Sequence, residues 1–341
     1  MKIEELGEFR LIERITKPFG HPKNSSTLIG VGEDAALLDY GGERKTLVAT
    51  ELLMEGVHFD LVYFPLQYLG FKAVTSAVSD IIAMGGTPQQ ILISLGISTR
   101  FQVEDIEALM RGVLDGAELY GVDLVGGDTT SSYTGLAIGI TAIGDVAKEE
   151  QLLRAGAKEN DLICVSGNIG AAYMGLQLLI REKVAYDDGV PDFQPKFEGR
   201  EYILQRQMKP IARLDILRQL QANGIRPTSM IDITDGLASD LLQICKSSGV
   251  GARVFEQRLP VDHETVGMAE EFGLSPTTVA MNGGDDFELL FTVPLGVKDL
   301  VDALPDVRQI GYITDAASGV VLISSGGSET TITAQGFPNS I

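Results

Sequence analysis

The sequence has few cationic side chains and a large excess of acidic ones. Its 341 residues include 27 Lys and Arg against 47 Asp and Glu, which gives a formal net charge of −20. A nucleic-acid backbone would be repelled by that charge, so we expect no nucleic-acid partner. A smaller phosphate-containing ligand would need positive charge from elsewhere, and divalent metal ions are the natural source.

Cysteine and long apolar runs are also scarce. Cys164 and Cys245 are the only cysteines, so a disulfide framework is excluded and a reducing compartment is expected. No run reaches the roughly 18 apolar residues of a membrane-spanning helix, and the charged start MKIEELGEFRLIERI is not typical of a signal peptide. Because 44% of the residues are hydrophobic, we expect a globular, cytoplasmic protein with no membrane partner.

Strand and helix patterns alternate in both halves of the sequence. The first half predicts strands at residues 47–50, 91–95, 123–125 and 136–143, and helices at 66–81 and 103–120. After a polar segment at 146–160, the second half predicts strands at 162–166, 230–233, 287–293, 307–313 and 320–323, and helices at 171–180, 201–208, 211–222 and 237–248. Residues 182–200, with Pro, Gly and mixed charges, are expected to form a surface insertion. This order predicts an α/β (α+β) protein with two domains, residues 1–146 and 147–341.

Glycine is abundant and gathers next to acidic residues. The 39 glycines exceed the usual share, which is about 7%. Four segments place glycines beside acids, namely residues 30–38 (GVGEDAALL), 124–130 (LVGGDTT), 231–236 (IDITDG) and 282–290 (NGGDDFELL). A fifth acid, Asp80, lies near the end of an otherwise apolar helix face. A single Asp beside Gly most often forms a turn, but a cluster of carboxylates repels itself unless a cation joins it. The set therefore favours a magnesium site.

The common nucleotide-binding signatures are missing. The sequence has no G-x-x-x-x-G-K-[ST] and no H-R-D or D-F-G set, which excludes a P-loop enzyme and a protein kinase. Residues 166–170 (SGNIG) lack the third glycine of a dinucleotide loop and predict a tight turn. By default His58 is a structural histidine, Arg154 a solvated charge and Phe337 a packing residue.

Taken together, these segments resemble the thiamine-monophosphate kinase family, within the aminoimidazole ribonucleotide synthetase superfamily. The resemblance runs from about residue 7 to residue 294 and returns near residue 337. It implies a two-domain aminoimidazole ribonucleotide synthetase-like fold and a homodimer in which strands of the N-terminal domain pair across the subunits. It also implies direct, Mg²⁺-dependent transfer of the γ-phosphate of ATP to thiamine monophosphate.

The resemblance also implies roles for individual residues. Metal ligands are expected at Asp34, Thr50, Glu51, Asp80, Asp128, Asp232 and Asp235; ATP contacts at Gly127, Asp128, Arg154 and Thr234; and contacts to thiamine monophosphate at His58, Asp285 and Phe337. Four positions depart from the family pattern: Glu51 replaces Asp, Ala49 replaces Ser or Thr, Ala77 replaces Asn, and Asp285 replaces Glu. No protein nucleophile is implied, because positioning and charge neutralisation carry phosphoryl transfer.

Two alternatives remain at this point. The first is another ATP-dependent enzyme of the same superfamily, although the chain has no cysteine where a selenophosphate synthetase or the hydrogenase-maturation member would need one. The second is a non-catalytic acidic protein that binds metal without turning over ATP.

Overall fold

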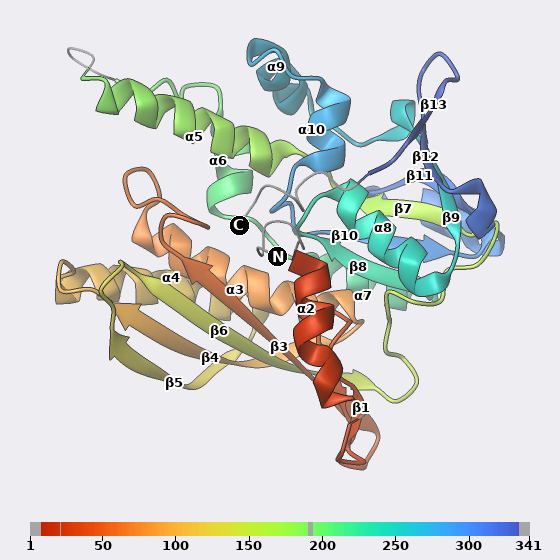
Figure 1. Cartoon of the computed structure of the whole chain (residues 1–341), viewed down its shortest axis with the longest axis horizontal. Coiled ribbons are helices and arrows are strands. Elements are labelled where there is room, and N and C mark those ends of the chain that lie inside the picture. Colours follow the sequence, from red (N-terminus) through yellow and green to blue (C-terminus); the bar gives the residue numbers. More distant parts are fainter. Residues whose placement is uncertain (1–7, 21, 190–193, 334–341) are drawn as a thin grey trace.

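The computed structural model describes residues 8–20, 22–189 and 194–333, which form two β-sheets with helices packed around them (Figure 1). A helix, α2 (Glu8–Thr16), and a 3₁₀ turn, η1 (Lys17–Phe19), precede the first sheet. Among the described residues, no helix has both the length and the apolar character needed to cross a membrane.

The first sheet has six strands in the order β1-β2-β3-β6-β4-β5. Its pairs are antiparallel except for the parallel β4–β5 pair. Two helices follow β3 and β4 in the chain and lie along the sheet (Figure 1). The elements are β1 (Thr27–Ile29), β2 (Ala36–Leu38), β3 (Arg44–Met54), α3 (Leu66–Ala83), β4 (Thr87–Ile97), α4 (Val103–Tyr120), β5 (Asp123–Ser131) and β6 (Ala137–Ala147).

The second sheet has seven strands in the order β13-β12-β9-β11-β7-β10-β8. Only its β9–β12 pair is parallel. Its strands are β7 (Leu162–Ser166), β8 (Ser229–Ile233), β9 (Gly251–Phe255), β10 (Glu288–Val293), β11 (Val307–Thr314), β12 (Val320–Ile323) and β13 (Glu329–Thr331). The helices of this half are α5 (Ala171–Asp187), α6 (Glu201–Met208), α7 (Leu214–Ala222), α8 (Leu237–Ser248), α9 (His263–Glu271), α10 (Pro276–Asn282) and α11 (Lys298–Asp302), with short 3₁₀ turns η2 (Glu256–Arg258), η3 (Leu295–Val297) and η4 (Ala316–Ser318).

The mixed α/β class is confirmed, and the corrections concern element ends and short elements. The helix predicted to end at residue 180 continues as α5 to Asp187, so a surface insertion from residue 182 was wrong at its start. Glu182 is buried there and forms an ion pair with Arg181. The helix predicted from residue 211 begins at Leu214. Short elements such as β9 and α10 were not predicted, because five or seven residues carry little periodicity.

The first sheet ends at Ala147 and the second begins at Leu162. The expected domain division at residues 146 and 147 stays a prediction.

Helix α3 is the central element of the molecule. It contacts α4 and strands β3, β4 and β6 on one side, and α6, α7 and β8 of the second half on the other. A helix enclosed in this way must be apolar nearly all round, as its sequence is. One apolar core cluster extends from Leu47 and Ile81 to Leu217 and Phe291 and so joins both halves. Several buried polar side chains of α3 contact the second half: Lys72 donates to Gln207 and Asp285, Thr75 to Pro210, and Ser79 to Asp232.

Strand β5 contains the segment LVGGDTT, whereas the sequence predicted a strand only over residues 123–125. The strand instead runs through the segment to Ser131. A Cβ added at Gly127 would lie 1.8 Å from the carbonyl oxygen of Ile93 in β4. Gly127 is thus required by the close approach of the two strands.

Candidate active site

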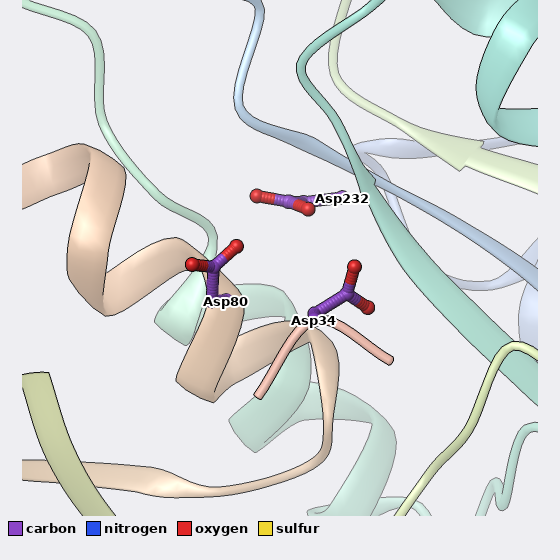
Figure 2. A group of neighbouring side chains, drawn as sticks. All are labelled: Asp34, Asp80 and Asp232. Atoms are coloured by element: carbon purple, nitrogen blue, oxygen red, sulfur yellow. The ribbon is translucent and has the colours of Figure 1, made fainter. Parts of the chain in front are cut away.

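Three carboxylates from distant parts of the chain converge between the two halves. Asp34 precedes β2, Asp80 lies in the last turn of α3, and Asp232 lies in β8. Each offers a carboxylate oxygen, and these oxygens lie within 4.8 Å of one another. Figure 2 shows Asp34 and Asp80 directed toward Asp232. We call these three residues the acidic cluster.

Protein groups fix one oxygen of two of these carboxylates. The Arg154 side chain donates to Oδ1 of Asp34 through Nε at 3.1 Å and through Nη2. Ser79 Oγ, next to Asp80 on α3, donates to Oδ2 of Asp232. The second oxygen of Asp34, Oδ2, is buried and has no hydrogen-bond partner among the described residues. Among the described residues, the cluster therefore contains one buried acceptor oxygen that receives no hydrogen bond.

Burial raises the pKa of all three acids, and repulsion from neighbouring carboxylates adds to the rise at Asp80 and Asp232. Burial raises the pKa of Asp34, and it raises the pKa of Asp232 to about 7 with a further contribution from the Asp34 charge. The pKa of Asp80 is raised well above its usual value by burial and then by Asp232. A cation bound between such carboxyl groups stabilises their ionised forms and lowers their pKa values. An oxygen-only donor set is the kind that Mg²⁺ prefers, so the residues present fit that ion.

The turn after β8 lies beside the cluster and carries Thr234 and Asp235. Asp240, in the first turn of α8, accepts hydrogen bonds from the backbone N–H groups of Thr234 and Gly236, each at 3.2 Å. Asp240 is buried, and its pKa is raised well above the usual value by burial and then by the Asp235 charge. It fixes the shape of the turn that presents Asp235.

Glu51 and Thr50 are neighbours on β3 and face opposite sides of the first sheet. Glu51 lies on the same side as the buried Ala49 and Leu53, and its charge contributes to the raised pKa values of Asp80 and Asp232. Thr50 is exposed on the open side, where its hydroxyl bonds to that of Thr141 at 3.1 Å. The structure brings Glu51 near the cluster and turns the Thr50 side chain away from it.

Asp128 and Gly127 lie on β5, at the edge of the first sheet. The register pairs Asp128 with Ser94 of β4, and β6 and β4 separate β5 from β3. Asp128 is exposed and does not belong to the acidic cluster of the single chain. The metal and ATP roles expected for Asp128 and Thr50 stay predictions.

Of the residues expected to contact thiamine monophosphate, His58 and Asp285 are not members of the acidic cluster. His58, in the loop after β3, is exposed, and its Nδ1 accepts from the backbone N–H of Met54 at 3.0 Å. Asp285 accepts from Lys72 Nζ at 2.9 Å. Phe337 lies outside the described residues.

No role was expected from the sequence for Lys72, Ser79 or Asp240. Lys72 and Ser79 could have been noticed as polar residues of the apolar helix that ends near Asp80. Asp240 follows the Asp235-Gly236 turn in the first turn of a predicted helix, a position from which a carboxylate accepts backbone N–H bonds.

Two family descriptions match the chain. AIR synthase related protein, N-terminal domain, matches residues 32–146, and AIR synthase related protein, C-terminal domain, matches residues 158–324. The chain is 34% identical over 315 residues to thiamine-monophosphate kinase of Aquifex aeolicus, covering 92% of this chain and 94% of that protein. It is 31% identical over 338 residues to thiamine-monophosphate kinase of Bacillus subtilis, covering 97% and 99%. The chain belongs to the thiamine-monophosphate kinase family.

A solved structure of this family agrees. The structure of AaThiL complexed with AMPPCP and TMP superposes with a TM-score of 0.82 at 32% identity, covering 97% of this chain and 96% of that one. In this member of the family, Asp34 and Asp80 lie in the region that matches the N-terminal domain, and Asp232 lies in the region that matches the C-terminal domain. The acidic cluster therefore forms where the two matched regions meet.

Proposed function

We propose that this chain transfers the γ-phosphate of ATP to thiamine monophosphate, giving thiamine diphosphate and ADP, with Mg²⁺ held by Asp34, Asp80 and Asp232. The acidic cluster carries the proposal, together with the buried Asp34 oxygen that has no hydrogen-bond partner in the described part of the chain. Membership of the thiamine-monophosphate kinase family supports the choice of acceptor. The AaThiL structure, which holds AMPPCP and TMP together, supports the use of ATP as co-substrate.

The cluster suits a reaction between two phosphate groups. When bound, Mg²⁺ supplies the positive charge that lets two anionic groups approach and that polarises the phosphoryl oxygens. The chain's own residues orient the ligand oxygens. Arg154 holds Oδ1 of Asp34 and leaves Oδ2 for the ion, while Ser79 holds Oδ2 of Asp232 and leaves Oδ1. Glu51 adds negative charge beside them.

The acceptor end would lie toward Asp285 and His58. Thiamine carries a fixed positive charge on its thiazolium ring, and the carboxylate of Asp285 is a suitable partner for a cation. Asp285 and Thr234 are joined by a backbone hydrogen bond of 2.9 Å, from the N–H of Asp285 to the carbonyl of Thr234. This bond supports a single continuous site from the turn after β8 to the acceptor.

We also propose a homodimer formed through the first sheet, in the cytoplasm. All nine residues of β5 are exposed, including Leu124 and Val125, and β5 is an edge strand. An exposed edge strand is a template for pairing with another chain. The two cysteines, both buried and free, suit a reducing compartment.

The direct test measures thiamine diphosphate by chromatography after incubation with ATP, Mg²⁺ and thiamine monophosphate. Product should form only with all three, and unphosphorylated thiamine should be a poor acceptor. ADP release at the same rate without thiamine monophosphate would overturn the assignment. Mg²⁺ binding without any turnover would instead identify a non-catalytic metal-binding protein.

A further inference from the structure

Lys72 is a buried cation on α3 that has no role in the proposed function. Its Nζ donates to Asp285 Oδ2 at 2.9 Å and to the carbonyl oxygen of Gln207 at 3.3 Å, and it lies 5.7 Å from the centre of the Phe64 ring. We propose that Lys72 is a positioning residue that fixes the Asp285 carboxylate for the thiamine end of the substrate. This inference rests on the proposed function.

The side chains of Lys72 and Asp285 differ in exposure, which indicates different roles. The Lys72 side chain is 5% exposed, whereas that of Asp285 is 43% exposed. Lys72 therefore lies behind the carboxylate, and Asp285 presents its remaining surface to solvent and to a ligand. With its donors directed at Asp285, Gln207 and the Phe64 ring, Lys72 acts through Asp285 and does not contact the substrate itself.

The backbone around Asp285 needs such support. Asp285 and Phe287 adopt φ values of 62° and 53°, in the left-handed region that non-glycine residues seldom occupy. A Cβ added at Gly284 would lie 2.4 Å from the carbonyl oxygen of Thr234, so the loop lies directly on the turn after β8. The ion pair with Lys72 adds a second attachment, to the first half of the chain.

Helix α3 thereby sets the spacing between the two ends of the site. Ser79 holds Asp232 of the acidic cluster, and Lys72, on the same helix, holds Asp285. The separation of seven positions from Lys72 to Ser79 corresponds to about 10 Å along a helix axis. Loss of the Lys72 charge should therefore free the Asp285 carboxylate and weaken binding of thiamine monophosphate. The acidic cluster and the proposed binding of ATP should be unaffected.

The test is Lys72→Met, which removes the charge and keeps an unbranched apolar stem. We expect KM for thiamine monophosphate to rise about tenfold, the loss of one charge-assisted hydrogen bond. KM for ATP should stay within about twofold of wild type. Lys45→Met is the matched control: Lys45 is also buried, but its ammonium group pairs with Glu149 at 3.7 Å and donates to Gln151 at 3.3 Å, and neither is a proposed site residue. Its two KM values should stay near those of wild type.

A double-mutant cycle with Asp285→Asn separates positioning from a general effect on the fold. Once Asp285 is neutral, Lys72→Met should add less than about twofold to KM for thiamine monophosphate. Additive effects, equal changes in both KM values, or normal KM values with a lower Tm would each overturn the inference. If Lys72→Met does not fold, Lys72→Gln is measured in the same way. Wild-type protein that makes no thiamine diphosphate would refute the proposed function itself, whatever the variants do.

Discussion

The molecule contains two groups of buried acids that are neutralised in different ways. The acidic cluster of Asp34, Asp80 and Asp232 has Arg154 bonded to Asp34. The second group, Asp286 and Glu288, lies in the second half of the chain. There Glu288 accepts from Arg206 at 3.0 Å, from Arg213 at 2.6 Å and from Ser166 at 2.5 Å, and Asp286 accepts from the backbone N–H of Gly170 at 2.6 Å, at the start of α5.

Burial is similar in the two groups, so counter-charge is the difference. Burial raises the pKa of both Asp232 and Asp286 to about 7. In the second group two guanidinium groups surround two carboxylates, and the acids fix the loop that leads to Asp285. In the acidic cluster an oxygen of Asp34 lacks a partner within the described residues. Within the described residues, two guanidinium groups neutralise the second group, whereas the three carboxylates of the acidic cluster have one ion pair, from Arg154 to Asp34, which is why we propose that this cluster binds a cation.

The largest expected effect comes from breaking the second group. Glu288→Gln removes the carboxylate that forms ion pairs with the buried Arg206 and Arg213. The free energy of unfolding should fall by about 3 kcal/mol, as for other broken buried ion pairs. A urea denaturation series measures it. Glu329→Gln, which removes the surface partner of Arg253, is the control and should cost less than about 1 kcal/mol. Equal, small losses in both variants would show that the two arginines do not depend on Glu288.

The acidic cluster should respond in the opposite way. Asp80→Asn should lower kcat on the order of 100-fold, because it removes a ligand of the charge-neutralising ion. Without Mg²⁺ its Tm should equal or exceed that of wild type, because the substitution relieves repulsion among carboxylates. Asp115→Asn on α4, where Asp115 accepts from Gln67 at 2.8 Å, is the control and should leave kcat unchanged. Near-normal activity with a lower Tm would make Asp80 a structural residue.

A smaller effect should appear in the pH dependence of stability. The pKa of Asp232 is raised to about 7 in the folded chain, against 3.8 as its ordinary value. Without metal, the folded state keeps a proton that the unfolded state releases, so stability should decline as pH rises from about 4 to about 7. Mg²⁺ must displace that proton. The rise in Tm on adding Mg²⁺ should therefore be larger at about pH 8 than at about pH 5.

Asp286 titrates in the same range, so only the difference between Tm with Mg²⁺ and Tm with a chelator isolates the acidic cluster. Thermal unfolding across this pH range, with Asp232→Asn as control, provides the measurement. A Mg²⁺ effect that is independent of pH in the wild type would contradict the raised pKa of Asp232.

The residue types and their local patterns were enough to predict the chemistry available to this protein and most of its regular elements. Strong periodicity predicted α3 and α4, and alternation predicted the central part of β4, because these signals lie within about ten to twenty neighbouring residues. The glycine-acid segments and Asp80 drew attention to carboxylates as metal ligands, and the resemblance they support led to the thiamine-monophosphate kinase family.

Which of these acids come together depends on the three-dimensional packing of the chain. Asp34, Asp80 and Asp232 come together because α3 is enclosed between the first sheet and the second half, a long-range arrangement that no local pattern encodes. Strand order placed Asp128 at an edge, and the two-residue repeat of β3 turned Thr50 away from Glu51. Likewise, Lys72 acquired a partner 213 residues away. Residue types are local properties, but the charges that surround each buried group depend on how the whole chain packs.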